Sequence, residues 1–428
     1  MSIYDRRQVL RFGASAMVGA VLSRFAMRDA LADGAASVPA AGGAQSPIAG
    51  TAKAVIVLYM NGGPSHIDTW DPKPGAATGG PHKAIKTRTA GLQISEHMPR
   101  LADMSDKFAV VRSMSSKEGN HQRAQYLLRT GYAPNPTVIH PSLGGWVSKK
   151  LGEPKNGLPA FVSLGGPSLG AGFLGVQYGP FVLPKPGLPA NVTYGVDTDQ
   201  PRFERRLGLL DAMEQRFSQS TGDAKVEGRR ALSRKSVALM HTPDLSAFDL
   251  SKEEPTRLAS FGDTDFGRGC ATAARLVEKG VRCVEVMLDG WDTHKDNFNR
   301  VKTLMGTLDA AMSSLITELS RRNLLDSTLI VWMGDFGRTP RINGNEGRDH
   351  YPQAWSTVLA GAGIKKGQVY GETDANGEKV TKDLVSVPNL AATIATVLGM
   401  DPSESFLSPV GRPIALTDSG APINALLA

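Results

Sequence analysis

The chain has 428 residues, enough for one large α/β domain or for two to three smaller domains. Hydrophobic residues make up 41% and charged residues 21%, which excludes a chain that is disordered throughout. Two cysteines exclude a cysteine-rich zinc module or a disulfide framework. The formal charge is +7, but five arginines and two aspartates of that balance lie in residues 1–32. The excess that remains is small and contains no long basic run, so we expect no nucleic-acid partner.

Residues 1–32 have the pattern of an export signal. Arg6 and Arg7 form a pair, residues 12–22 are apolar, and residues 30–32 form a small-x-small site with cleavage after Ala32. The apolar stretch is too short to span a membrane as a stable helix. The pattern resembles a twin-arginine signal, so we expect the twin-arginine translocase as a partner and a periplasmic or extracellular protein. The alternative is an amphipathic helix of the mature fold.

The rest of the chain is predicted to form one domain behind a short lead-in. Residues 33–51 are small, polar and rich in Gly and Pro, which favours a flexible segment. Residues 52–428 then form a single domain. No other segment has the roughly 18 consecutive apolar residues of a membrane helix, so no stable membrane span is expected.

Five apolar runs rich in β-branched residues predict strands: residues 54–60, 108–112, 281–288, 327–333 and 356–360. Such continuous runs are typical of strands buried on both faces of a parallel sheet. Helical patterns alternate with them, at residues 265–279, 299–323 and 387–398, with two more helices in 202–241 broken at Thr221 and Gly222. This alternation predicts an α/β fold with a mostly parallel central sheet. Residues 154–200, rich in Gly and Pro, predict a long excursion that roofs a site.

Four of the eight histidines follow predicted strands, and sites in open α/β sheets form at the carboxyl ends of strands. Imidazole nitrogens and carboxylate oxygens are the donors that zinc- and manganese-type cations prefer. The sequence therefore predicts a centre with one or two divalent ions, of Zn or of Mn/Ca type. Its candidate ligands are Asn61, His66, Asp292, His294, Asp335, Asp349 and His350, with His121 nearby.

Simpler interpretations exist for several polar residues. Asp335 is also a turn residue before Gly337, and Asp68 can cap a turn with Thr69. His82, His97, His140 and His241 lie outside these segments and receive no role. Cys270 and Cys283 are expected to be structural thiols, with a disulfide after export as the alternative.

The order of these segments resembles a family of exported bacterial proteins, domain of unknown function 1501, of the alkaline phosphatase and sulfatase superfamily. The resemblance covers about residues 53–402 and is carried by residues 61–74, 290–294, 334–340 and 347–350. It implies an alkaline-phosphatase-like fold with helices on both faces of the sheet. It also implies hydrolysis of phosphate or sulfate esters, with one or two divalent metals and a Ser, Thr or formylglycine nucleophile.

Carried over by position, the resemblance places Asn61 where the superfamily usually has its first metal-binding Asp. Asp292 and His294 lie near an Asp-His pair, at a shorter spacing than usual. Asp335 matches the Asp of a second pair, and His350 matches a later single His. Phe336 stands where the histidine of that second pair is expected.

The expected nucleophile is the main departure from the superfamily. Residues 121–132 resemble the sulfatase stretch around its Cys or Ser, yet no cysteine is near and His121 stands at the helix start. Ser115 and Ser116 lie a few residues earlier and are poor substitutes. Attack by water and a covalent intermediate both stay open.

Two functions follow from these residues. The first is an exported metal-dependent hydrolase of phosphate or sulfate esters of a small molecule or glycan, with His121 and Arg338 catalytic. In that function Arg112, Arg123 and Arg348 bind the anionic ester. The alternative is a non-catalytic exported protein that keeps the fold and serves in binding or assembly, which the missing nucleophile and Phe336 favour.

Overall fold

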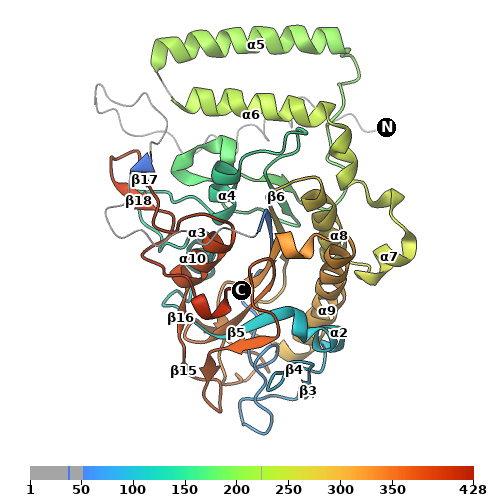
Figure 1. Ribbon diagram of the computed structural model, residues 1–428, viewed down its shortest axis with the longest axis vertical. Coiled ribbons are helices and arrows are strands. Elements are labelled where there is room, and N and C mark those ends of the chain that lie inside the picture. The colour runs from blue at the N-terminus through green and yellow to red at the C-terminus, as the bar shows by residue number, and fades with distance from the viewer. Residues whose placement is uncertain (1–36, 39–51, 223) are drawn as a thin grey trace. The chain divides into compact units, whose positions relative to one another are not determined.

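The computed structural model describes residues 37–38, 52–222 and 224–428 (Figure 1). The predicted export signal and most of the lead-in lie outside these residues. The strands of the central sheet are β2 (Ala54–Met60), β5 (Phe108–Ser115), β6 (Phe161–Leu164), β7 (Phe181–Leu183), β8 (Cys283–Leu288), β9 (Thr328–Gly334), β12 (Trp355–Gly361), β13 (Gln368–Tyr370) and β16 (Val385–Ser386). The α-helices are α2 (Pro99–Asp103), α3 (His121–Thr130), α4 (Leu143–Leu151), α5 (Gln200–Thr221), α6 (Ala224–His241), α7 (Pro255–Ser260), α8 (Asp265–Glu278), α9 (Asn297–Arg321) and α10 (Val387–Val397).

The remaining strands form small accessory sheets. β3 (Ala84–Lys86) pairs with β4 (Gln93–Ser95), β10 (Gly337–Arg338) with β11 (His350–Tyr351), and β14 (Glu372–Thr373) with β15 (Val380–Lys382). A three-stranded sheet joins β1 (Ser37–Val38), β17 (Ser405–Leu407) and β18 (Pro413–Ala415).

The central sheet runs in the order β13-β5-β12-β9-β2-β8-β6-β7, and β16 pairs with β5 beside β13. β2 lies parallel to both β8 and β9, so the three central strands end at the same edge. β12 is antiparallel to both of its neighbours, β5 and β9, and the other pairs are parallel. The mostly parallel α/β sheet that the sequence predicts is confirmed.

Helices cover both faces of this sheet, because side chains along each strand alternate between two hydrophobic cores. In β2, Ile56 and Leu58 pack into the core with α8 and α9, whereas Val57 and Tyr59 pack into the core with α3, α4 and α10. Figure 1 shows α8 and α9 on one side of the sheet and α3 and α10 on the other. The central sheet is therefore covered by a layer of helices on each face.

All five predicted strands are present, with ends shifted by a few residues, and so are the predicted helices. Residues 154–200 differ from the prediction. They contain β6 and β7, which extend the sheet beyond β8, and a loop in which Ser168 hydrogen-bonds Glu285. Strands this short owe their order to pairing, of β6 with β8 and of β7 with β6, which no local pattern reveals.

Within the described residues, none of the helices combines the length and apolar character needed to cross a membrane. Cys270 and Cys283 are both free and buried, so the thiol interpretation is confirmed in this structure.

Candidate metal centre

The central strands deliver polar side chains to one edge of the sheet. Asp292 and His294 follow β8, Asp335 follows β9 directly, and Asn61 follows β2. Because β2 lies between β8 and β9 and all three run parallel, these residues leave the sheet side by side.

His121 and His350 reach the same place from two other elements. His121 is the first residue of α3, whose N-cap Asn120 accepts a hydrogen bond from the Arg123 amide at 3.3 Å. His350 lies in β11, directly opposite Arg338 of β10. The first turn of α3 thus positions the His121 imidazole, and the pairing of β10 with β11 positions the His350 imidazole.

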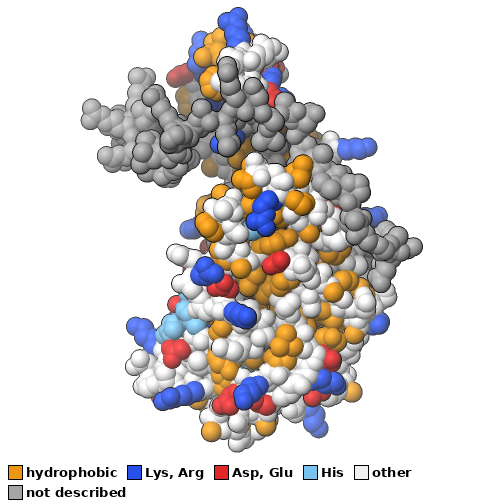
Figure 2. Space-filling model, turned by 90° about the vertical axis from the view of Figure 1, so that its left-hand side faces the viewer, with side chains coloured by type: hydrophobic (Ala, Val, Ile, Leu, Met, Phe, Trp, Pro, Cys, Tyr) orange, Lys and Arg blue, Asp and Glu red, His pale blue; other side chains and the backbone are white. Residues whose placement is uncertain are grey.

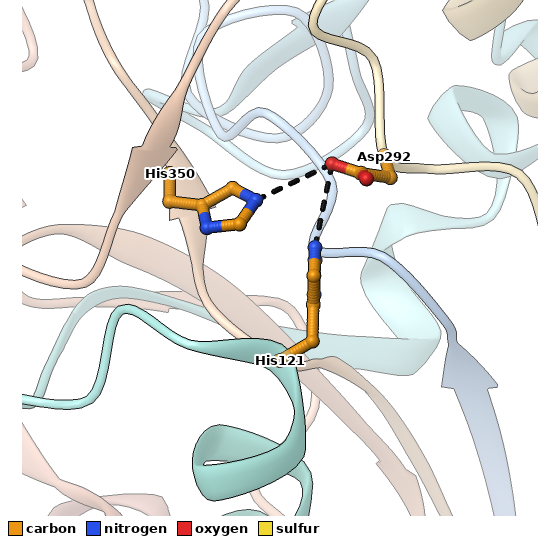
Figure 3. Close-up of side chains that lie close together, drawn as sticks. All are labelled: His121, Asp292 and His350. Atoms are coloured by element: carbon orange, nitrogen blue, oxygen red, sulfur yellow. Dashed lines mark hydrogen bonds and ion pairs between the residues drawn. The ribbon is translucent and has the colours of Figure 1, made fainter.

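Three imidazole nitrogens converge on a single carboxylate oxygen. The Nε2 atoms of His294, His121 and His350 lie 3.1, 3.3 and 3.4 Å from Oδ1 of Asp292. In Figure 3, His121 at the start of α3 and His350 in β11 both point at Asp292. The donor atoms of His121, Asp292 and His350 all lie within 4.8 Å of one another, close enough to hold one metal ion.

The other nitrogen of each ring faces an oxygen acceptor. Nδ1 of His121 lies 2.7 Å from Asp335, and Nδ1 of His294 lies 2.7 Å from Asp349. Nδ1 of His350 lies 2.8 Å from the Gly119 carbonyl, which can only accept. Each Nδ1 therefore donates, and a neutral ring leaves its Nε2 lone pair pointing inward. Metal-binding histidines are held in this way.

The inward nitrogens are poorly satisfied by the side chains around them. Nε2 of His121 is buried and has no hydrogen-bond partner, although it lies near Asp292. The Nε2 atoms of His294 and His350 are 3.0 Å apart, and two lone pairs at that distance repel unless a cation or a proton lies between them. The residues present thus fit a divalent cation, which satisfies all of these lone pairs at once.

Asp335 lies behind His121 and is surrounded by donors. Its Oδ1 accepts from the Tyr59 hydroxyl, and its Oδ2 accepts from the Gly62 amide at 3.2 Å and from His121. The hydrogen bond that His121 donates to Asp335 raises the pKa of His121, and burial raises the pKa of Tyr59. Asp335 was predicted as a ligand, but both of its oxygens are engaged, so the structure gives it the position of an outer partner that orients His121.

Asp292 is balanced by a buried arginine. Nη2 of Arg338 donates to Asp292 Oδ1 at 2.6 Å. Burial opposes ionisation of Asp292, but the hydrogen bond and positive charge of Arg338 lower its pKa to about 2. The carboxylate is therefore ionised across the physiological range.

Two glycines let the loops of the site approach one another. A Cβ on Gly62, whose φ is +111°, would lie 2.4 Å from the amide nitrogen of Asp292. A Cβ on Gly347 would lie 1.9 Å from the carbonyl oxygen of His294. Both contacts are closer than any side chain permits, so these positions need glycine.

The cluster is open to solvent on one side. The side chains of His294 and Asp292 are 44% and 47% exposed, whereas those of His121 and His350 are 26% and 27% exposed. A structural metal site is normally closed, so partial exposure is typical of a site that admits a ligand or substrate.

The predicted catalytic role of Arg338 and the predicted ester-binding role of Arg348 both conflict with the burial of these side chains. Both side chains are 0% exposed. Arg338 also donates to the Gly62 and Gly63 carbonyls, and Arg348 forms a buried ion pair with Asp68 at 2.7 Å. Neither guanidinium faces solvent, so both hold the loops of the site together and neither can meet a substrate as placed.

Other predicted residues lie away from the three converging imidazoles. His66 is buried with its Nε2 2.8 Å from the Gly377 carbonyl, and no contact within the described residues joins it to the cluster. Asn61 lies beside the site, where its amide bridges Asp289 and Gln125. Arg112 bonds the Trp70 carbonyl, also away from the cluster.

Arg123 and the nearby serine are bound to their own segment. Arg123 forms an exposed ion pair with Glu118 at 2.6 Å, two residues along α3 from His121. Ser116 accepts a hydrogen bond from the Glu118 amide at 3.3 Å. Arg123 is therefore the one predicted ester-binding arginine that remains exposed next to the site.

Several residues of the site escape sequence reasoning. Tyr59 lies within an apolar strand run, and Gln125 lies one helical turn after His121, on the face that meets Asp335. The Phe336 ring stacks on the His121 ring with centroids 4.9 Å apart. The sequence offers one signal for Gln125: it lies four residues after His121, which places both side chains on the same face of the helix.

The family model described as "Protein of unknown function (DUF1501)" matches residues 52–427. The chain belongs to this family. The match confirms the predicted resemblance and includes every residue of the site above. No protein with a curated description matches the chain in sequence.

Solved structures similar to the chain include sulfatases and alkaline phosphatase superfamily proteins. The PsFucS1 sulfatase from Pseudoalteromonas sp. is 14% identical with a TM-score of 0.40, over 81% of this chain and 68% of that one. The lipoteichoic acid synthase LtaP from Listeria monocytogenes is 8% identical with a TM-score of 0.39, over 87% and 76%. An alkaline phosphatase superfamily protein from Vibrio parahaemolyticus is 10% identical with a TM-score of 0.37, over 83% and 68%. Scores this low carry no argument about what this chain does.

Proposed function

We propose that the protein is an exported, metal-dependent hydrolase of phosphate or sulfate esters. The observation that carries the proposal is the convergence of three imidazole Nε2 atoms on Asp292, each ring anchored through its Nδ1. The family resemblance described above supports the substrate class, an anionic ester on a small molecule or glycan.

His121, Asp292 and His350 would hold the metal. Two imidazoles and one carboxylate form a donor set that suits zinc or a similar first-row cation better than calcium, which prefers oxygen donors alone. When bound, such an ion polarises an ester oxygen and lowers the pKa of a water molecule. Asp335 and Gly119 orient the two rings, and Arg338 balances the Asp292 carboxylate.

His294 has the geometry of a general base. Its Nδ1 donates to Asp349, which fixes the neutral ring with Nε2 pointing into the cluster, and the ring is nearly half exposed. The pKa of Asp349 is lowered mainly by that hydrogen bond, so the carboxylate stays ionised behind the ring. In this role Nε2 takes a proton from an attacking water as the water oxygen bonds to the phosphorus or sulfur atom. The ester bond from that atom to the alkoxide oxygen breaks, and the alkoxide takes a proton from solvent to leave as the alcohol.

Direct attack by water is favoured over a covalent intermediate. Within the described residues, the cluster contacts of His121, Asp292, His294 and His350 involve imidazoles, carboxylates, Arg338 and the Gly119 carbonyl, and no serine or threonine hydroxyl. Ser116 is turned to its own loop. Within the described residues, none of the hydrogen bonds of the three imidazoles is made with a side-chain hydroxyl.

The metal is tested first, by elemental analysis of the purified full chain. We expect divalent metal in the native protein and at least about a tenfold weaker affinity in His121→Ala and in His350→Ala, because each change removes a donor. His241→Ala, a change of an exposed histidine bonded to Tyr194, is the matched control and should keep full occupancy. Equal metal content in all four proteins would place the metal elsewhere.

Turnover of an aryl phosphate and an aryl sulfate then tests the chemistry. His294→Ala should keep its metal and lose activity by about 10² to 10⁴-fold, the usual contribution of a positioned base. If it loses the metal instead, His294 is a fourth ligand. Metal without turnover of any ester would support the alternative, a binding or assembly protein that keeps the centre.

A further inference from the structure

Most of the helical hairpin of α5 and α6 lies outside the two hydrophobic cores, since Leu239 of α6 is its one described residue in either core. α6 packs against the 3₁₀ turn Val176–Tyr178, and α5 packs along α6 (Figure 1). α5 is 22 residues long and none of its side chains is buried. Its ends are well defined, with Asp199 as N-cap and Gly222 in the left-handed conformation as C-cap. Most helices in proteins are stabilised by packing of an apolar face, so a long, capped helix that leaves one face uncovered is unusual.

Apolar side chains form a stripe on the open face of α5. Leu209, Met213 and Phe217 recur every fourth residue, which places them on one face of the helix. They are 66%, 61% and 57% exposed. Three large apolar side chains in a row, all directed to water, cost free energy unless something covers them.

Arginines share this face with the stripe. Arg202, Arg205, Arg206 and Arg216 each lie three, four or seven positions from Leu209 or Met213, so they flank it. No ion pair joins Arg205 or Arg216 to an acid within the part of the chain that the structure describes. Figure 2 shows basic and hydrophobic side chains together at the top of the molecule, where α5 and α6 lie.

The acids of α5 are turned away from this face. Glu214 pairs with Arg229 of α6 at 3.2 Å, and Asp211 pairs with Arg230 of α6 at 2.8 Å. Glu204 accepts a hydrogen bond from Gln200 at 2.8 Å. The hairpin thus uses its acids internally and presents an acid-free mixture of arginines and apolar side chains.

We propose that the open face of α5 docks on the surface of an anionic lipid membrane. Arginines bind phosphate headgroups while Leu209, Met213 and Phe217 enter the boundary between headgroups and acyl chains. A second copy of the same face fits poorly, since the pairing would bring arginines against arginines. A nucleic acid would meet the arginines but leave the apolar stripe uncovered. The site and its ester chemistry are independent of this docking.

Vesicle co-sedimentation of the full chain tests the proposal. We expect binding to vesicles of phosphatidylglycerol mixed with phosphatidylcholine, little binding to phosphatidylcholine alone, and a decrease as salt is raised. A triple change, Leu209→Ser with Met213→Ser and Phe217→Ser, should lower binding at least about tenfold, because insertion is lost. The matched control is Leu384→Ser with Val410→Ser, two comparably exposed apolar residues outside the hairpin; it should bind as the native chain does.

Charge is tested separately from apolar contact. Arg205→Glu with Arg216→Glu should abolish the preference for the anionic vesicles, and neither residue packs in a core, so the melting temperature should hold. A Met213→Cys chain labelled with an environment-sensitive dye should shift to shorter wavelength on anionic vesicles, since both native cysteines are buried. Undiminished vesicle binding by both variants, or binding to an acidic polypeptide in place of vesicles, would overturn the proposal.

Discussion

The Asp335 carboxylate decides how His121 can use its second nitrogen. Every group that Asp335 contacts is a donor: the Tyr59 hydroxyl, the Gly62 amide, the Gln125 amide and the His121 ring. A carboxylate is the only side-chain group of this size that accepts from all of them. The orientation of the imidazole is thus set by residues that do not themselves reach the cluster.

Asp335→Asn should weaken metal affinity by about 10 to 100-fold without unfolding the protein. The new amide group turns a donor toward other donors, so His121 loses the partner that fixes its tautomer. Titration with zinc and a competing chelator measures the change, with Asp326→Asn, at an exposed residue, as the control. Native affinity in Asp335→Asn would mean that the His121 ring is held by other contacts.

Single residues differed in how well the sequence revealed them. His121, Asp292, His294 and His350 could be chosen because imidazole and carboxylate groups at strand ends carry chemical meaning. The roles of Arg338 and Arg348 could not be predicted, because the sequence around an arginine does not show whether its side chain is exposed or fully buried. Tyr59 looked like one more apolar strand residue.

Among the elements, α9 is the longest helix of the described residues, and its last turn carries a charged cluster. Glu318 accepts from Nε of Arg321 at 2.9 Å and from Nε of Arg322 at 2.6 Å, and its side chain is 7% exposed. The hydrogen bonds from Arg321, with those from Arg322, lower the pKa of Glu318 to about 2. Such a carboxylate stabilises the folded state only while it is ionised.

Glu318→Gln should destabilise the protein by about 1 to 3 kcal/mol at neutral pH. Because the folded pKa lies below the unfolded value near 4.5, the contribution of the native carboxylate is complete above about pH 4.5. It is lost as the pH falls through about 2. The gap between the native protein and the variant should therefore close on acidification, as measured by urea unfolding at several pH values. Glu372→Gln, at an exposed ion pair, is the control and should show a much smaller gap.

The elements themselves could be predicted where they are long and periodic. β2, β8, β9 and α8 follow from apolar runs and helical spacing alone. The direction of β12 could not be predicted, because an apolar run reads the same in parallel and antiparallel strands. β6 and β7 were missed because they are short and gain their order from pairing, β6 with β8 and β7 with β6.

At the scale of the whole molecule, we propose that the predicted export signal directs the protein out of the cytoplasm. The arginine pair Arg6 and Arg7 is the part of the predicted signal that the twin-arginine translocase reads. Export after folding would allow the metal to enter in the cytoplasm, before the protein meets a competing pool of ions outside.

Changing Arg6→Lys together with Arg7→Lys should leave full-length protein in the cytoplasm. The charge is unchanged, so only the receptor-read identity of the pair is lost. Cell fractionation and immunoblotting measure the result, with Arg24→Lys and Arg28→Lys, outside the pair, as controls that should be exported. Normal processing of the double variant would be incompatible with twin-arginine export.

The two free, buried cysteines can report local and global unfolding of the protein through their rates of alkylation. Cys270 on α8 and Cys283 on β8 are 0% and 1% exposed, and burial raises the pKa of both thiols. An alkylating reagent can reach either sulfur only after a local or global opening, so the alkylation rate counts such events. Cys270 lies on a helix that covers the sheet, and Cys283 lies on a central strand. Faster alkylation of Cys270 than of Cys283 would therefore show that α8 unfolds locally before the sheet does. Repeating the measurement with a chelator tests which of the two motions the proposed metal restrains.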